Sequence, residues 1–203
     1  MQNQRIAKIY DRQARYFDVG MGLGERLLLG RLRRRVLTEA RGEVLEIGVG
    51  SGASLSYYPS GCKVTGLDLS SGMLGRARRR ADKLGLDAVF FQGDAQRLPF
   101  EDAAFDTCVS QLSLCTVPEP LAALRELGRV CKPGGRILLM EHTTSLNPAL
   151  GKVCRYFGPM LTRGAACHPN RPIVELVAQA GLRIERSERH VAGIFVLIWA
   201  APP

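Results

Sequence analysis

The segment from Val44 to Gly52, Val-Leu-Glu-Ile-Gly-Val-Gly-Ser-Gly, combines a short apolar strand, an acidic residue and three glycines. Glycines at 48, 50 and 52 let the backbone turn sharply and approach a ligand without an intervening side chain. A helix just after the turn, expected at residues 52–58, would direct its N–H groups at that ligand. This order of elements indicates a nucleoside-type cofactor bound by a doubly wound α/β fold.

The acidic residue in this segment, Glu46, narrows the choice of ligand. A negative charge beside the turn is unfavourable for a pyrophosphate, and it favours a ligand that is cationic or rich in hydroxyl and amine groups. A Rossmann dehydrogenase is the structural competitor, but its GxGxxG motif requires a third glycine where this chain has Ala53-Ser54-Leu55. We therefore favour a cofactor other than a dinucleotide.

Strands and helices alternate along most of the chain, which predicts a mostly parallel sheet with helices on both faces. The expected strands are 43–47, 62–67, 88–92, 105–110 and 135–141, and the remaining expected helices are 4–18, 22–40, 71–84, 118–131 and 171–180. Pro133-Gly134-Gly135 forms a turn between a helix and a strand. Two further strands, 182–189 and 193–200, are close enough in sequence to pair as an antiparallel hairpin at the sheet edge.

Length and composition indicate a single domain, residues 1–203, of an ordinary globular protein: 46% of the residues are hydrophobic and 23% are charged. No apolar run approaches the roughly 20 residues that span a bilayer. The polar start of the chain, Met1 to Asp11, lacks the core of a signal peptide, so we expect a cytoplasmic protein. The cysteines form no CxxC pair, and the cysteines and histidines lack metal-ligand spacing. We therefore expect no disulfides and no metal.

The formal net charge of +9 is unevenly distributed. Basic residues are concentrated in the first fifth of the chain, and Arg76, Arg78, Arg79 and Arg80 form a second group. Two interpretations remain open: solvated helix faces, or attraction to an anionic membrane surface. Nucleic acid is not expected, because no aromatic residues alternate with the basic ones as a stacking platform requires.

Two parts of the chain stand apart from the sheet. Residues 1–40 are expected to form an N-terminal helical cap. Residues 143–170 contain three prolines and a short apolar and basic segment. This insertion follows a central strand on the cofactor side, so it is either a substrate lid or a surface helix that packs on the sheet.

The predicted strands carry polar residues at the ends that face the binding crevice. Asp68 lies about twenty residues past the glycine turn, where a carboxylate can accept both ribose hydroxyls. Asp94 follows the third strand and can accept from the exocyclic amine of adenine, and Gln111 ends the fourth strand. Each signal is weak alone, since an aspartate after a strand is often a helix cap. In this order they are strong together.

These motifs resemble those of the class I S-adenosylmethionine-dependent methyltransferases: Glu46 to Gly52, Asp68, Gly93-Asp94-Ala95 and Arg129 to Gly135. The resemblance covers roughly residues 5–200. It implies a seven-stranded sheet whose last pair is antiparallel, and S-adenosylmethionine as cofactor with S-adenosylhomocysteine as product. The cofactor-binding residues that it implies are Glu46, Gly48, Gly50, Gly52, Asp68, Leu69, Met73, Asp94, Ala95 and Gln111.

Four residues near the crevice are candidates for the methyl-transfer step. Tyr10 and Tyr16 of the N-terminal helix are alternatively caps over the cofactor, and Cys115 is alternatively a packed thiol. His142 is either a general base or a simple hydrogen-bonding partner. Methyl transfer is an in-line displacement that depends mainly on alignment and exclusion of water, and a thiol acceptor additionally needs to lose its proton.

Two subfamilies are similar to this chain beyond the shared motifs. Tyr10-Asp11, Tyr16-Phe17-Asp18 and the closing strand at 193–198 look like the bacterial phospholipid N-methyltransferases and their quinone-methylating relatives. The segment 58–65, Leu114 to Val117 and Met140-Glu141-His142 are similar to methyltransferase-like thiol S-methyltransferases, whose N-terminal membrane anchor is absent here.

We expect a lipophilic acceptor, first the amine of phosphatidylethanolamine and its methylated derivatives at a membrane surface. Hydrogen sulfide or small alkyl thiols are the alternative, and a quinone is a further one. The basic N-terminal helices favour the phospholipid, with peripheral binding to the inner membrane face. A non-catalytic cofactor-binding subunit is the remaining class.

Overall fold

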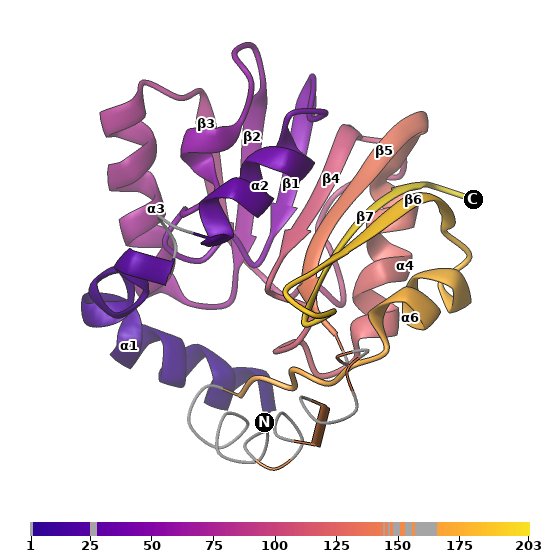
Figure 1. Cartoon of the computed structure of the whole chain (residues 1–203). Coiled ribbons are helices and arrows are strands. Elements are labelled where there is room, and N and C mark those ends of the chain that lie inside the picture. Colours follow the sequence, from indigo (N-terminus) through magenta and orange to yellow (C-terminus); the bar gives the residue numbers. More distant parts are fainter. Residues whose placement is uncertain are drawn as a thin grey trace.

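The computed structural model describes residues 2–24, 28–143, 145, 147, 151–152, 156 and 166–203, without the side chains of residues 15–24. In this part of the chain, seven strands form one sheet in the order β3-β2-β1-β4-β5-β7-β6 (Figure 1). The pairs from β3 to β5 are parallel, and β7 runs antiparallel to both of its neighbours. The fold is therefore the doubly wound α/β class expected from the sequence, with the antiparallel pair at its edge.

Most element bounds follow the predicted alternation, but the first two helices differ: one runs from Gln2 to Gly24, past the end expected at residue 18, and the next spans only Gly30–Leu37 of the expected 22–40. The strands are β1 (Glu43–Ile47), β2 (Lys63–Asp68), β3 (Ala88–Gln92), β4 (Phe105–Gln111), β5 (Cys131–His142), β6 (Arg183–His190) and β7 (Phe195–Ala201). The helices are α1 (Gln2–Gly24), α2 (Gly30–Leu37), α3 (Ser71–Leu84), α4 (Pro120–Val130) and α6 (Ile173–Gln179), with a short 3₁₀ helix, η2 (Leu55–Tyr57).

One expected helix is wrong. The segment 52–58 contains only the three-residue 3₁₀ helix η2, because the chain leaves the glycine turn in further turns. β5 also begins earlier than expected, at Cys131, which pairs with Phe105 of β4 before the register shifts. Pro133-Gly134-Gly135, expected to form a turn before the strand, therefore lies inside β5 at this irregularity.

Alternate residues of the strands point to two separate apolar layers, as the period of a strand requires. Leu45 and Ile47 of β1 face the layer that contains residues of α4 and α6. Val44 faces the other layer, with residues of α2 and α3. Helices therefore cover both faces of the sheet, and the central strands are buried between them, as a mostly parallel sheet requires.

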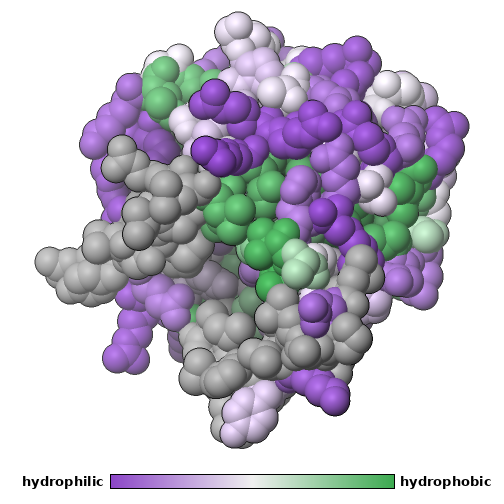
Figure 2. All heavy atoms as spheres, viewed as in Figure 1, coloured by the Kyte–Doolittle hydropathy of each residue, from purple (hydrophilic) through white to green (hydrophobic). Residues whose placement is uncertain are grey.

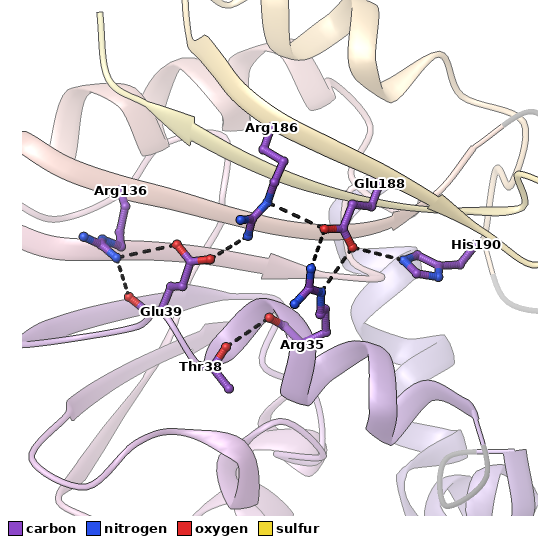
Figure 3. A network of polar contacts seen from close by, with 7 residues as sticks. All are labelled: Arg35, Thr38, Glu39, Arg136, Arg186, Glu188 and His190. Atoms are coloured by element: carbon purple, nitrogen blue, oxygen red, sulfur yellow. Dashed lines mark hydrogen bonds and ion pairs between the residues drawn. The ribbon is translucent and has the colours of Figure 1, made fainter.

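An ionic network holds α2 against the far edge of the sheet (Figure 3). Arg35 of α2 donates two hydrogen bonds to Glu188 of β6, of 2.8 and 3.2 Å. Glu39, just past α2, accepts a hydrogen bond from Arg186 of β6, whose guanidinium lies 3.7 Å from the ring centroid of Trp199. Single exposed ion pairs stabilise little. This network chiefly fixes the position of α2 relative to β6 and β7.

The strand order reverses between β1 and β4. The chain adds β2 and β3 on one side of β1 and then returns to place β4 on the other side. In open α/β sheets, such a switch point leaves a crevice at the carboxyl ends of the strands, where ligands bind. In Figure 1, α1 lies across this end of the sheet.

Candidate cofactor and acceptor site

A cavity of about 1020 Å³ occupies the crevice at the switch point. Its walls come from the ends of β1, β2 and β4, from α1, and from the segment before α6. A volume of this size lies at the upper limit for small-molecule sites. The cavity therefore offers room for a large cofactor and part of a second molecule.

The three glycines of the turn have positive φ angles of 61°, 55° and 77° at Gly48, Gly50 and Gly52. A Cβ atom on Gly48 would collide with Ser113, and one on Gly52 would lie 2.6 Å from Leu55 Cδ1. At Gly50 the nearest atom would be the Gly48 carbonyl oxygen, at 3.9 Å. Gly48 and Gly52 thus allow close packing, whereas Gly50 leaves open space for a ligand.

Asp68, the last residue of β2, joins the glycine turn to the start of α3. Its Oδ2 accepts a hydrogen bond of 2.9 Å from Gly50 N, and its Oδ1 accepts one of 2.9 Å from Ser70 N. Burial raises the pKa of Asp68, and these backbone hydrogen bonds oppose the rise. A carboxylate has about four acceptor positions, so lone pairs remain for a ligand.

Glu46 is buried beneath the turn, with 2% of its surface exposed. Its Oε2 accepts hydrogen bonds from Ser54 Oγ at 2.7 Å and from the Tyr58 hydroxyl at 2.9 Å. Burial raises the pKa of Glu46 to about 7, although these bonds and the charge of Arg33 oppose the rise. A cationic ligand in the cavity would lower this pKa and stabilise the ionised form.

Gln111, at the end of β4, presents an unused donor. Its Oε1 accepts a hydrogen bond of 2.5 Å from Arg33 Nη1, which fixes the amide orientation because a guanidinium can only donate. Its Nε2 is buried and has no hydrogen-bond partner among the described residues. A buried N–H without a partner is costly, so this position fits an acceptor group of a ligand.

Asp94, beyond β3, is bound by side chains from two directions. Asn3 of α1 donates to Asp94 Oδ2 over 2.6 Å, and Gln96 donates to both carboxylate oxygens. Asp11 anchors the same helix by accepting hydrogen bonds from Ser70 Oγ at 2.6 Å and Gly72 N at 2.9 Å. The amino-terminal helix is therefore attached at two points to the wall of the crevice that follows β2 and β3.

Most predicted site residues meet in this one cavity. Nine of the ten cofactor-site residues line it: Glu46, Gly48, Gly50, Asp68, Leu69, Met73, Asp94, Ala95 and Gln111. Gly52 packs against Leu55 and Ala77 instead. Tyr10, Cys115 and His142 also line the cavity. The side chain of Tyr16 lies outside the described residues, as does most of the segment 143–170.

One part of the cavity wall, here named the acceptor end, is formed by Cys115, His142 and Cys167, whose thiol sulfurs and ring nitrogen all lie within 4.8 Å of one another. A hydrogen bond from Cys115 stabilises the Cys167 thiolate, which lowers the pKa of Cys167, and the proton is retained on Cys115. Burial raises the pKa of the nearby Tyr10, so its phenol stays neutral. Two thiols, an imidazole and a phenol therefore share this end.

The buried carboxylate of Glu141 holds the loop that carries Cys115. Glu141 Oε1 accepts hydrogen bonds from Ser110 Oγ at 2.6 Å and from the backbone N–H groups of Ser113 and Leu114 at 3.2 Å each. Arg171 donates to the carbonyl oxygens of Leu114 and Val117. These contacts fix the loop on both sides of Cys115.

Several site residues were missed from the sequence. Ser54 and Tyr58 hold Glu46, and Arg33 holds Gln111, but the sequence marked none of the three as a site residue. Cys167 was not singled out from the sequence, and only its position beside His168 in the segment 143–170 could have set it apart. Each of these residues reaches the site through tertiary contacts.

The fold and the cavity define a nucleoside-cofactor site at the switch point of a doubly wound α/β domain. A family model described as a methyltransferase domain matches residues 45–139. The chain is 38% identical over 145 residues to phosphatidylethanolamine N-methyltransferase of Cereibacter sphaeroides, covering 70% of each chain. It is 34% identical over 174 residues to demethylmenaquinone methyltransferase of Renibacterium salmoninarum, covering 82% of this chain and 69% of that relative.

Solved structures show the same fold at lower identity. A SAM-dependent methyltransferase of Thermotoga maritima has a TM-score of 0.73 at 22% identity, covering 98% of this chain and 100% of that one. The cyclase SpnF has a TM-score of 0.80 at 19% identity, covering 99% and 96%. Structural similarity at this level of sequence identity establishes only the fold. The reaction is indicated by the relatives of higher identity.

The chain belongs to the class I S-adenosylmethionine-dependent methyltransferases, and S-adenosylmethionine is its cofactor. The described residues fit this molecule. Gly50 leaves open space at the turn, the buried carboxylate of Glu46 suits a cation, and the buried Nε2 of Gln111 lacks a partner within the described chain.

Proposed function

We propose that this methyltransferase methylates the amine of phosphatidylethanolamine and its methylated derivatives at a membrane surface. The observation that carries the proposal is the 38% identity to a phosphatidylethanolamine N-methyltransferase, over 70% of both chains. The size of the cavity and the basic outer face of α1 support it.

The cofactor supplies a methyl group on a positively charged sulfur. Around it, Asp68 would accept the ribose hydroxyls and Asp94 the adenine amine, after Asn3 has given up its hydrogen bond to that carboxylate. Glu46 would complement the positive charge of the methionine part, and Gln111 Nε2 would donate to its carboxylate. Leu69, Met73 and Ala95 line the cavity and would enclose the adenine ring.

The residues at the acceptor end would align the amine and take up its proton. An ammonium head group has no lone pair, so it must lose a proton before it attacks the methyl group. Nδ1 of His142 is buried and without a hydrogen-bond partner among the described residues, so it is our candidate for the acceptor of that proton. Tyr10 and Cys115 would orient the head group, and Tyr16 is proposed to cap it from α1.

The amino-terminal helix would bring the site to the lipid. Arg5, Lys8 and Arg12 are exposed on α1 and repeat at the spacing of one helix face, whereas Ile6 and Ala14 are buried. A helix with a basic outer face binds anionic membrane surfaces. No helix of the described residues is long and apolar enough to cross a bilayer.

The surface next to the crevice is compatible with lipid access. Figure 2 shows apolar side chains gathered in the middle of the face that carries α2, with hydrophilic side chains above them. We further propose that residues 1–40 act as a cap over the crevice and residues 143–170 as a substrate lid, all within a single domain 1–203.

Quinone methylation is the second candidate, because the demethylmenaquinone methyltransferase relative matches a longer stretch, 174 residues. Small thiols are a third. Transfer of a labelled methyl group by the full chain to phosphatidylethanolamine vesicles, a demethylquinone, hydrogen sulfide and a short alkyl thiol separates them. We expect the label in the phospholipid. Label in the quinone or thiol alone would refute the proposal, and cofactor binding without transfer to any of them would indicate a non-catalytic subunit.

A further inference from the structure

The cluster at the acceptor end has the composition of a metal site. Cys115 follows β4, His142 ends β5, and Cys167 precedes α6, so three separate segments each contribute one soft ligand. Their ligand atoms all lie within 4.8 Å of one another. Two thiolates and an imidazole are a zinc donor set, and a site with three protein ligands leaves a fourth position open.

We propose that Cys115, His142 and Cys167 bind one zinc ion whose open fourth position faces the cofactor cavity. All three residues line that cavity. Zinc–sulfur and zinc–nitrogen distances of about 2.3 and 2.0–2.1 Å place neighbouring ligand atoms of a tetrahedral site about 3.5–3.8 Å apart. Each pair therefore has to close by about 1.3 Å at most.

The segments that carry the ligands are already joined by hydrogen bonds. His168 N donates to the carbonyl oxygen of Cys115 over 2.8 Å, which ties the Cys167 segment to the Cys115 loop. Glu141, directly before His142, holds the N–H groups of the same loop. Such supporting contacts orient ligands and raise metal affinity.

The histidine is already joined to the cluster, because its side chain forms a hydrogen bond with Cys167. Its Nδ1 is buried and has no hydrogen-bond partner among the described residues. The imidazole is held by its ring contact with Phe195, with 5.0 Å between the ring centroids. A zinc-bound imidazole keeps its second nitrogen as an N–H donor, so zinc binding would replace the proton-accepting role proposed for His142, and the open fourth position would face the acceptor.

The spacing of these three residues along the sequence does not indicate a metal site. The ligands lie 27 and 25 residues apart, far from the two- to four-residue spacing of common zinc motifs. The expectation of no metal rested on that spacing alone. Only the return of the chain past β5 to the Cys115 loop brings the ligands together.

Cobalt titration of the reduced, metal-stripped full chain tests the proposal. We expect one cobalt ion per chain, with thiolate-to-cobalt charge-transfer absorption that zinc abolishes by displacement. Cys167→Ser and Cys115→Ser should each weaken the charge-transfer band, and His142→Ala should lower zinc affinity at least about 10-fold. Cys131→Ser is the matched control, because Cys131 and Cys108 form a thiol pair that has no third ligand within the described chain. It should leave binding unchanged.

A second measurement needs no substitution. Zinc should slow alkylation of Cys167 in the wild-type chain, while the labelling of Cys62 stays the same, as read by mass spectrometry. Absence of stoichiometric cobalt or zinc binding, binding unaffected by Cys167→Ser, or unprotected Cys167 would overturn the proposal. None of these outcomes depends on the identity of the methyl acceptor.

Discussion

The cofactor half of the cavity and its acceptor end are built in different ways. The glycine turn, Asp68 and Asp94 come from consecutive strand–loop units, and backbone groups within 20 residues hold Asp68 in place. At the acceptor end, Cys115, His142 and Cys167 come from segments that are distant in sequence and meet only in the folded chain. The cofactor half is therefore determined by neighbouring stretches of the sequence, whereas the acceptor end is assembled by tertiary contacts.

The largest effect should follow from removing the carboxylate at the centre of the cofactor half. Asp68→Ala takes away the acceptor for the ribose and the partner of Gly50 N, so we expect S-adenosylmethionine affinity to fall about 100-fold or more. Calorimetric titration measures this. Asp82→Ala, at an exposed position of α3, is the control. Equal affinity of Asp68→Ala and wild type would contradict the ribose role.

A slightly smaller effect is expected from the basic face of α1. Replacing Arg5, Lys8 and Arg12 by Gln should weaken binding to anionic vesicles about 10- to 100-fold at low salt, since each cation near such a surface contributes about 1 kcal/mol. The control replaces Arg78, Arg79 and Lys83, which are exposed on α3. Vesicle sedimentation decides the outcome. Equal losses in the two triple variants would show that overall charge, and not α1, recruits the protein.

Glu46 gives the cofactor half a pH dependence. Burial raises its pKa to about 7, and a cationic ligand favours the ionised form. Below pH 7 the carboxyl is protonated in the free protein, so S-adenosylmethionine affinity should rise about 10-fold from pH 6 to pH 8. Glu46→Gln should flatten this dependence. A pH profile that is the same in both proteins would mean that another group responds.

The raised pKa of Glu46 also determines whether the stability of the folded protein rises or falls with pH. An acid whose pKa is higher in the folded than in the unfolded state binds more protons when folded, so wild-type stability should decline as the pH rises from about 4.5 to 7. The decline should be smaller in Glu46→Gln. Urea denaturation at pH 5 and pH 7 measures the difference between the two proteins.

The smallest effect concerns the contact between α1 and the cofactor half. Asn3 donates to Asp94 Oδ2 and would compete there with the adenine amine in the role proposed for Asp94, so Asn3→Ala should tighten S-adenosylmethionine binding about 3-fold. Gln4→Ala, at an exposed position of the same helix turn, is the matched control. Weaker binding in Asn3→Ala would mean that α1 supports the cofactor more than it competes with it.

The sequence was sufficient where local motifs decide the structure. The strand ending at Ile47, the helix from Ser71 to Leu84 and the positions of Asp68 and Asp94 in the cavity wall follow from period, capping and turn chemistry. It was insufficient where packing decides. Where a helix was expected at residues 52–58, the chain forms only the short 3₁₀ helix Leu55–Tyr57.

The residues that hydrogen-bond to Glu46 and Gln111 could not be predicted either, because packing of the folded chain brings them together. Tyr58 reaches Glu46 across 12 residues, and Arg33 reaches Gln111 across 78. Nothing in the spacing of these residues marks them as partners. Cys167 joins the acceptor end only because the chain returns past β5, so its role is invisible in a linear pattern.

The central claim is that the donor site is complete without the acceptor end. Calorimetric titration of the wild-type chain with S-adenosylhomocysteine, in the absence of vesicles and of any methyl acceptor, tests it most directly. We predict saturable binding of one molecule per chain, unchanged when Cys115 or Cys167 is replaced by Ser. Binding that requires vesicles or an acceptor, or that is lost in either cysteine variant, would contradict the account.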